Sequence, residues 1–197
     1  LQRNAGARRL VVNLVLGTLP AVAIGLPTEK WIEARLFHPL PVALAFAVGG
    51  LVILWVERSS IRAEVASVDD IPLKKALGVG LFQVLAVVFP GTSRSGATII
   101  GGMVLGLSRT AATEFSFFMA IPAMLGASVI KLWKVRDLVT AADVPLFAVG
   151  FAVSFVSAAL VIRGLLAYVS RRSFAPFAWY RIGFGALILA VYWNRPF

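Results

Sequence analysis

Long runs of apolar residues, separated by short polar stretches, dominate the chain. A helix needs about 20 mainly apolar residues to cross the roughly 30 Å hydrocarbon core of a bilayer. The first such run should end at Pro27, and Ser59–Asp70 should form an aqueous connector. We expect an all-α polytopic membrane protein, with residues 1–197 as a single membrane domain. Its five transmembrane helices are expected at Leu10–Leu26, Pro41–Val56, Ala111–Trp133, Pro145–Val169 and Phe174–Trp193.

Two further apolar segments, Ile71–Phe89 and Gly96–Leu107, are joined by the polar break Pro90–Ser95. The second segment reaches only roughly 18 Å at about 1.5 Å per residue, which is too short to cross a bilayer. The pair therefore predicts a re-entrant helix hairpin over residues 71–107 that enters and leaves on one side. Non-helical backbone at membrane depth is tolerated only where protein or a water-filled cavity surrounds it.

The composition agrees with a membrane protein, since 59% of the residues are hydrophobic and only 14% are charged. A soluble domain is nearer 45–50% apolar and about 25% charged. The formal net charge is +10, but the basic residues are not clustered with aromatic residues as in a nucleic-acid-binding surface. They lie between the apolar runs, where they set topology and meet lipid headgroups. We expect membrane lipids and no nucleic acid as partners.

The distribution of basic residues also predicts an orientation. With five spans and one hairpin, eleven basic residues fall on one side and six on the other, which favours the first side as cytoplasmic. The first side holds Arg3, Arg8, Arg9, Arg58, Arg62, Lys74, Lys75, Arg109, Arg163, Arg171 and Arg172, and the second holds Lys30, Arg35, Lys131, Lys134, Arg136 and Arg195. Glycines such as Gly49-Gly50 predict close helix packing in lipid.

The polar break has the features of an anion site. Phe89 precedes a proline, which favours the end of the incoming helix there. Ser95 is a good N-cap for the returning helix, whose first amides, those of Gly96, Ala97 and Thr98, would lack intrahelical partners. These amides and the positive end of the helix dipole would favour an anion.

Arg94 lies on the same turn, and its planar guanidinium matches phosphate oxygens in a bidentate manner. Hydroxyls from Thr92, Ser93, Ser95 and Thr98 add donors, and one of them could be a nucleophile. An arginine at membrane depth costs roughly 2.5–3.5 kcal/mol on insertion scales, which argues against an accidental loop. The alternative is a structural turn in which these hydroxyls only cap backbone groups.

Other polar residues have weaker assignments. Glu114 could pair with Arg94 or Arg109, relay protons, or be stabilised by its helix dipole. Gln83 could bond to the turn, line a cavity, or pack between helices. Arg181 is expected to snorkel or to bond a carbonyl. His38, the only histidine, is expected at the surface, and no metal ligands are predicted in this chain.

The Pro90–Thr98 segment resembles the second signature segment of the bacterial undecaprenyl-diphosphate phosphatase family, also called bacitracin resistance proteins. The resemblance covers nearly the whole chain. It includes Gln83, Gly101-Gly102-Met103, Ser108-Arg109, Glu114-Phe115-Ser116-Phe117, Pro145–Gly150 and Phe174–Arg181.

This resemblance implies a hydrolase that removes the terminal phosphate of undecaprenyl diphosphate, recycling the lipid carrier for peptidoglycan synthesis in the bacterial inner membrane. It also implies an inverted-repeat architecture with two re-entrant hairpins. Ser93 and Arg94 would be catalytic, and Arg94, Ser95, Gly96, Ala97 and Thr98 would bind the substrate phosphate. Thr92, Gln83 and Glu114 would be auxiliary residues. A polyprenyl diphosphate would be the partner, together with Mg²⁺ or Ca²⁺, and a homo-oligomer is compatible with this.

The glutamate-rich first signature of the family does not occur in these 197 residues. We therefore expect either an N-terminally truncated member or a degenerate one, and we favour the truncated member, which would be inactive alone and have the cation's ligands in the missing part. The competing hypothesis is a transporter or flippase-like protein that binds a lipid phosphate without hydrolysis, because broken helices also serve transporters. A histidine-dependent phosphatase is excluded, since no histidine follows His38.

Overall fold

A computed structural model describes residues 2–193 of the chain. The secondary structure of these residues is helical apart from a single bridge between Val65 and Leu107. Two short 3-10 turns, η1 (Val68–Asp70) and η2 (Ala141–Asp143), precede α3 and α6. The α-helices are α1 (Gln2–Leu36), α2 (Pro39–Arg58), α3 (Leu73–Val88), α4 (Arg94–Val104), α5 (Arg109–Val135), α6 (Val144–Val169) and α7 (Ala175–Tyr192).

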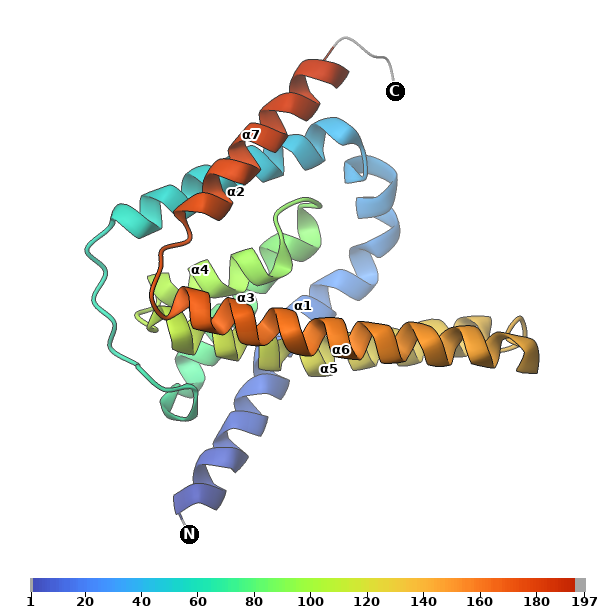
Figure 1. The fold of residues 1–197 in the computed structure, drawn as a ribbon, viewed down its shortest axis with the longest axis horizontal. Helices are drawn as coiled ribbons and strands as arrows, with labels where there is room; N and C mark the ends of the chain where they lie inside the picture. The colour runs from blue at the N-terminus through green and yellow to red at the C-terminus, as the bar shows by residue number, and fades with distance from the viewer. Residues whose placement is uncertain (1, 194–197) are drawn as a thin grey trace.

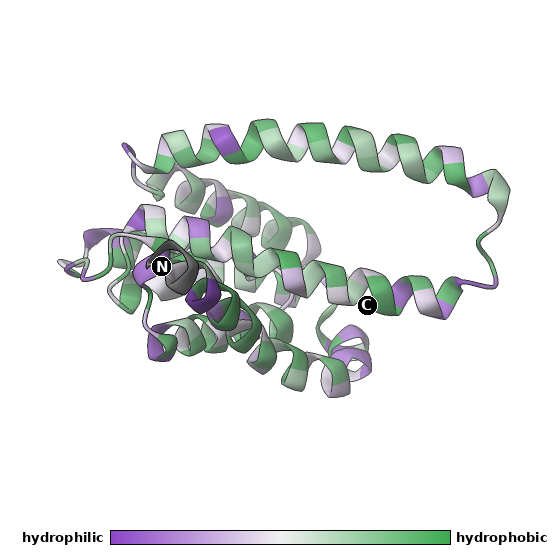
Figure 2. Cartoon of the chain, turned by 90° about the horizontal axis from the view of Figure 1, so that it is seen from below, coloured by the Kyte–Doolittle hydropathy of each residue, from purple (hydrophilic) through white to green (hydrophobic). Residues whose placement is uncertain are grey.

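Five segments of the described chain are long and apolar enough to cross a membrane, and they contain α1, α2, α5, α6 and α7. The five predicted spans are thereby confirmed, and the chain is a multi-pass membrane protein. Figure 2 shows that the two long helices joined at the right, α5 and α6, are predominantly hydrophobic along their length. The helices α3 and α4 have only 16 and 11 residues and form a helix–turn–helix hairpin.

The prediction that the first helix ends at Pro27 is wrong. Helix α1 continues to Leu36 with both Pro20 and Pro27 inside it, and it changes direction along its length (Figure 1). Pro27 removes the helical hydrogen bond to the carbonyl four residues earlier, that of Ala23, and a proline kinks a helix, but membrane helices tolerate it when neighbouring groups support the bend. The hydroxyl of Thr28 donates to the carbonyl oxygen of Ile24 at 2.5 Å, in the turn around Pro27.

Helices α2 and α7 lie side by side across the top of Figure 1. Their approach depends on glycine: a Cβ atom on Gly50 would lie 2.7 Å from the carbonyl oxygen of Ala178. One on Gly185 would lie 2.8 Å from the carbonyl oxygen of Ala43. The packing role predicted for the Gly49-Gly50 pair is confirmed for Gly50, and it brings two backbones together as small residues do in lipid.

The loop between α2 and α3 is paired with the end of α4. The amide of Glu64 donates to the carbonyl oxygen of Gly106 at 2.7 Å, and the amide of Ser108 donates to that of Val65 at 2.8 Å. Gly106 has a φ of +83°, a left-handed conformation that favours glycine. The first residue of α3 and the last of α4 therefore lie at the same, open end of the hairpin.

A buried carboxylate joins three further elements near this open end. Glu57, close to the end of α2, accepts hydrogen bonds from Arg109 Nε at 3.1 Å and Arg109 Nη2 at 2.5 Å. It also accepts one from the amide of Phe174 at 3.0 Å. The Glu57 side chain is only 7% exposed. This junction connects the end of α2 to the starts of α5 and α7.

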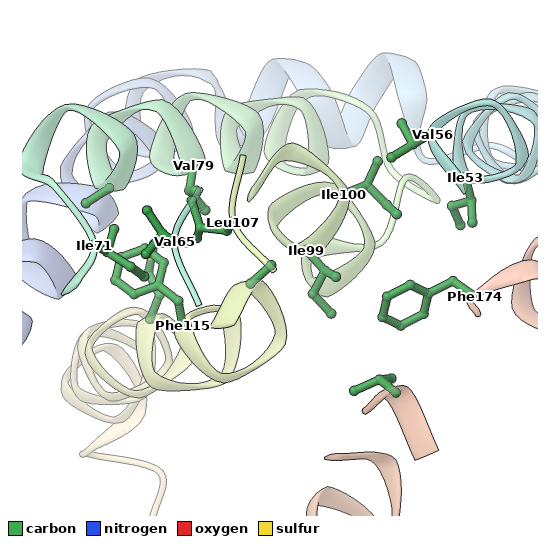
Figure 3. Packing of buried hydrophobic residues seen from close by; sticks show 14 of the residues in the cluster. Ile53, Val56, Val65, Ile71, Val79, Ile99, Ile100, Leu107, Phe115 and Phe174 are labelled. Carbon is green, nitrogen blue, oxygen red and sulfur yellow. The ribbon is translucent and has the colours of Figure 1, made fainter. Parts of the chain in front are cut away.

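The hydrophobic core lies around the hairpin and the first half of α5. Figure 3 shows Ile71, Val79, Leu107 and Phe115 gathered on one side, with Ile100 reaching toward α2 on the other. By contrast, no residue in the most apolar 18-residue window of α6 is buried. The core thus fixes the hairpin, whereas α6 contributes a face of exposed apolar side chains.

Candidate anion site at the turn between α3 and α4

The turn that joins α3 to α4 is built from Phe89 to Ser93. Phe89 ends α3 with extended backbone, as expected for a residue before proline. The amide of Thr92 donates to the carbonyl oxygen of Phe89 at 3.1 Å. Gly91 has a φ of +95°, and a Cβ atom there would lie 2.6 Å from the carbonyl oxygen of Val42 in α2. Glycine is required at this position for both its conformation and its contact.

Helix α4 begins at Arg94, and its N-cap is Ser93 rather than the predicted Ser95. The hydroxyl of Ser93 accepts from the amide of Gly96 at 3.2 Å, and its carbonyl oxygen accepts from the amide of Ala97 at 2.9 Å. Two of the amides expected to be available are therefore already bonded. The helix starts two residues earlier than predicted because Ser93 adopts a φ of 72°, which turns the chain sharply into the helix. Such a non-glycine conformation costs about 1–3 kcal/mol and concentrates at functional sites.

The amides at the new helix start belong to Arg94 and Ser95. The first amides of an α-helix have no intrahelical acceptor, and within the described residues these two have no acceptor elsewhere. The hydroxyls of Ser93 and Ser95 lie 3.4 Å apart beside them. Amides, hydroxyls and the helix dipole together make this corner favourable to an anion.

Arg94 is half-buried, and its Nη1 atom is buried without a hydrogen-bond partner in the described part of the chain. It takes part in no ion pair among the described residues. A buried charge without a partner is strongly unfavourable, so such a group is normally paired or binds a ligand. This guanidinium at the start of α4 is the clearest indication of a site for an anionic group.

The other predicted residues are distributed unevenly around the turn. Thr92 is half-buried at its edge, whereas Thr98 is 1% exposed and shares a 2.6 Å hydrogen bond with Ser116 of α5. The Thr98 hydroxyl also donates to the carbonyl oxygen of Arg94 at 2.9 Å. Thr98 is therefore turned toward α5 and supports the first turn of α4 from behind.

Gln83 and Glu114 lie apart from these contacts. Gln83 is 3% exposed in α3, and its Oε1 atom has no partner in the described part of the chain. Glu114 is half-buried. The predicted alternative of an ion pair between Glu114 and Arg94 or Arg109 is not found among the described residues. Arg109 instead binds Glu57, because the end of α2 lies against the start of α5.

One residue at the turn was not assigned to the site from sequence. Arg181, in the middle of α7, donates from Nη2 to the carbonyl oxygens of Gly91 at 2.9 Å and Ala45 at 3.1 Å. The carbonyl alternative predicted for Arg181 is thus confirmed. No sequence signal indicates that one of these carbonyls belongs to the turn, since Gly91 is 90 residues away along the chain.

An apolar cavity of about 670 Å³ opens beside the turn, between α2 and the hairpin. Most of its wall comes from aliphatic and aromatic side chains of α2, α3 and α4, including Leu44, Val48 and Phe82. Near the turn, Thr92, Gly96 and Ala97 line it. A hydrophobic space therefore adjoins the polar corner at the start of α4.

A divalent cation does not fit the residues described here. Within residues 2–193 no three His, Asp or Glu side chains gather, and the chain has no cysteine. The carboxylate of Glu57 is engaged by Arg109 and by the amide of Phe174. Mg²⁺ and Ca²⁺ need several oxygen ligands, which the acidic side chains of the described residues do not bring together.

Comparison with known proteins adds to this geometry. The model of the family described as "Bacitracin resistance protein BacA" matches residues 2–187. The chain belongs to this family. It is 55% identical over 197 residues to the undecaprenyl-diphosphatase of Variovorax paradoxus strain S110, covering 98% of this chain and 71% of that protein. It is 57% identical over 189 residues to the undecaprenyl-diphosphatase of Acidovorax ebreus strain TPSY, covering 95% and 69%.

A member with lower sequence identity is matched over a similar length. The undecaprenyl-diphosphatase of Pseudomonas putida strain W619 is 50% identical over 192 residues, with 98% of this chain and 69% of that protein covered. The matched regions include the α3–α4 turn, Arg181 and the Glu57–Arg109 junction, since the family match runs through residue 187. The candidate site thus lies inside the part of the chain that is common to the family.

Proposed function

We propose that this protein hydrolyses undecaprenyl diphosphate to undecaprenyl phosphate and inorganic phosphate, recycling the lipid carrier for cell-wall synthesis. The observation that carries the proposal is the buried, unpaired Nη1 atom of Arg94 at the start of α4, in a chain that belongs to this family. A diphosphate supplies the anionic oxygens that such a group needs.

The chemistry assigned to the turn is binding and charge stabilisation. Hydrolysis breaks the bond between the terminal phosphorus and the bridging oxygen, which leaves with the lipid phosphate. In the transition state negative charge is spread over the terminal oxygens, so positioned donors are the main catalytic requirement. We assign this task to Arg94 and to the amides of Arg94 and Ser95. The Ser93 and Ser95 hydroxyls would orient the phosphate. With Ser93 as nucleophile, its Oγ would bond the terminal phosphorus as the bridging oxygen leaves with the lipid phosphate, and water would then cleave the phosphoserine ester, which releases inorganic phosphate and returns the proton to Ser93.

The apolar cavity supplies a place for the lipid. Its walls are lined by side chains such as Leu44, Val48 and Phe82, and it meets the turn at Thr92 and Gly96. An isoprenyl chain is a branched hydrocarbon that would be stabilised by burial at about 25 cal/mol per Å² of apolar surface. We propose that the prenyl segment next to the diphosphate lies in this cavity while the phosphates face the start of α4.

The α3–α4 hairpin is proposed to be re-entrant. Gly91 at its tip contacts Val42 of α2, while its open end lies near Glu57 and Arg109. At about 1.5 Å per residue, the level of Val42 is roughly 24 Å from the end of α2. The 16 residues of α3 cover about the same length. The tip would then lie within the bilayer, and the inverted-repeat arrangement remains a prediction.

The setting of this activity follows from the substrate. We propose the bacterial inner membrane as the location, because undecaprenyl diphosphate is a membrane lipid and the chain is multi-pass. The partners are then the polyprenyl diphosphate and the surrounding lipids. A homo-oligomer and an Mg²⁺ or Ca²⁺ requirement stay predictions. The described residues offer no set of carboxylates for such an ion.

A test is to purify the full gene product and measure phosphate release from undecaprenyl and farnesyl diphosphate, with Mg²⁺, with Ca²⁺ and with chelator. Phosphate release from these diphosphates, and none from the monophosphates, is the expected result. Binding of the lipid without phosphate release would instead favour the transporter or flippase-like alternative. That alternative is favoured by the lack of clustered acidic side chains in the described residues, since the anion site at Arg94 would serve either function.

A further inference from the structure

Arg181 is a buried cation whose partners among the described residues are uncharged. It is 8% exposed, and its Nη2 atom bridges the carbonyl oxygens of Gly91 in the turn and Ala45 in α2. It forms no ion pair in the described part of the chain. Placing a guanidinium here is costly, so its two carbonyl bonds must have a role that a smaller apolar residue could not fill.

The surroundings of Arg181 fix its position. Its Cζ atom lies 4.7 Å from the centre of the Phe46 ring, a cation–π distance. Gly49 faces the guanidinium, and a Cβ atom there would overlap Nη2. The close contact of α2 and α7 through Gly50 and Gly185 holds the arginine's backbone. A planar donor group is therefore held rigidly against the turn.

The hydrogen bond from Arg181 to the Gly91 carbonyl lies where the backbone of the turn has its least favourable conformations. Gly91 has a left-handed conformation, and Ser93, two residues later, has another at φ 72°. Strained conformations persist only when surrounding contacts determine them. The Gly91 carbonyl is the one backbone group of this turn to which a side chain from another helix donates, among the described residues.

We propose that Arg181 is a positioning residue that fixes the turn from Gly91 to Arg94, so that Ser93 and Arg94 meet the substrate phosphate correctly. This rests on the proposed function. Arg181 acts on the turn through its Nη2 atom, which is engaged by two carbonyls, while its Nε atom is buried without a hydrogen-bond partner among the described residues. Its effect on the reaction is transmitted through the backbone of the turn, where a displacement of about 1 Å can cost 10²-fold in rate.

The test compares Arg181→Gln and Arg181→Lys in the full gene product, with farnesyl diphosphate as substrate. Gln should lower kcat by about 10²-fold while KM changes little, and Lys should recover part of the loss because it keeps a charged donor. The matched control is Arg163→Gln on the exposed face of α6, which should leave kcat unchanged. An unchanged kcat in folded Arg181→Gln would overturn the proposal.

A double-mutant comparison separates positioning from general stability. If Arg181 acts through Arg94, then Arg181→Gln should add little to the loss already caused by Arg94→Lys, since residues acting as a unit are not additive. Fully multiplicative losses would contradict this. If Arg181→Gln fails to fold, Gly49→Ala keeps the arginine but displaces its guanidinium, and it should lower kcat in the same way.

A second readout does not require activity. Hydrogen exchange of the Thr92–Gly96 amides should accelerate in Arg181→Gln and not in Arg163→Gln. Equal exchange in both variants would overturn the positioning role even if the protein hydrolysed nothing. A wild-type protein that releases no phosphate, but shows the exchange difference, would contradict the proposed function and leave the positioning role of Arg181 standing.

Discussion

Arg94 combines two properties at the scale of a single residue. Among residues 2–193, its Nη1 atom is buried without a partner, and its own amide begins α4 with no acceptor. A guanidinium can grip two phosphate oxygens at once, whereas an ammonium is a point charge. The shape of the donor group, as well as its charge, should therefore matter at this position.

Arg94→Lys should consequently lose most phosphate release although the charge is kept. Loss of one donor to a developing oxyanion typically costs about 10²–10³-fold in rate. The measurement is kcat and KM of the full gene product with farnesyl diphosphate. Arg171→Lys, the same change at an exposed position after α6, is the control and should behave like wild type. Near wild-type turnover by Arg94→Lys would remove Arg94 from the proposed site.

Gly91→Ala should destabilise the protein, since both the conformation and the space exclude a Cβ atom. A cost of at least about 1 kcal/mol is expected for a side chain in a left-handed conformation, in addition to the contact with Val42. The control is Gly126→Ala in α5, where nothing lies within 4 Å. That change should be neutral or stabilising by about 0.5–1 kcal/mol. Thermal unfolding in one detergent compares them, and equal midpoints would contradict the assigned geometry.

At the scale of elements, the sequence predicted what depends on local pattern and missed what depends on tertiary contact. The break at Phe89 and the short returning limb follow from Pro90 and from segment length. The start of α4 did not follow, because the left-handed conformation of Ser93 is held within a turn that also contacts α2 and α7. The continuation of α1 past Pro27 likewise involves its packing against α3, where a Cβ atom on Gly25 would lie 3.0 Å from Val87, a contact that local propensity does not include.

The candidate site shows the same division. Arg94 could be recognised from its residue type and depth in an apolar segment. The roles of Thr98 and Arg181 could not, since Thr98 is turned to Ser116 and Arg181 to Gly91 by helix packing. Glu57 gave no signal either, because a Glu-Arg pair at the end of an apolar run is typical of any membrane helix.

Glu57 should be important for stability at the junction of α2, α5 and α7. Glu57→Gln removes charge-assisted bonds to Arg109 and should cost on the order of 1–3 kcal/mol. Glu64→Gln is the control, because Glu64 is 72% exposed in its pair with Lys75 and exposed pairs contribute little. Thermal midpoints in the same detergent provide the comparison. A loss for Glu64→Gln as large as for Glu57→Gln would contradict this ranking.

The Glu64 control also has a pH signature. The hydrogen bond from Lys75, and then its positive charge, hold the pKa of the Glu64 carboxyl below its ordinary value. Any stabilisation from this pair is therefore present above the ordinary carboxyl pKa and is lost as the pH falls through the lowered value. Wild type and Glu64→Gln should converge in thermal midpoint at acid pH. A gap that widens on acidification would contradict the sign.

At the scale of the whole molecule, the hairpin sets the orientation of everything after it. If the hairpin returns to the side it entered from, the loops around Ser60 and Arg172 share one face, and the α5–α6 loop at Asp137 lies on the other. The Glu57 contacts to Arg109 and to the Phe174 amide are in line with this arrangement.

Single cysteines at Ser60, Arg172 and Asp137 test that topology, because the chain contains no cysteine of its own and all three positions are exposed. A membrane-impermeant thiol reagent should label the first two from the same face of sealed vesicles and Asp137→Cys from the opposite face. Labelling of Ser60→Cys and Arg172→Cys from opposite faces would show that the hairpin crosses the bilayer. The proposed position of the turn would then be wrong.

Helix α6 has a different consequence for the molecule. No residue in its most apolar 18-residue window is buried within the described part of the chain, so its apolar side chains are available to contact lipid or detergent. After solubilisation, the detergent that is used determines which alkyl chains contact α6. Micelles with short alkyl chains should loosen the α5–α6 arm while leaving the core around Phe115 intact. Two detergents can thus give different melting curves for one polypeptide.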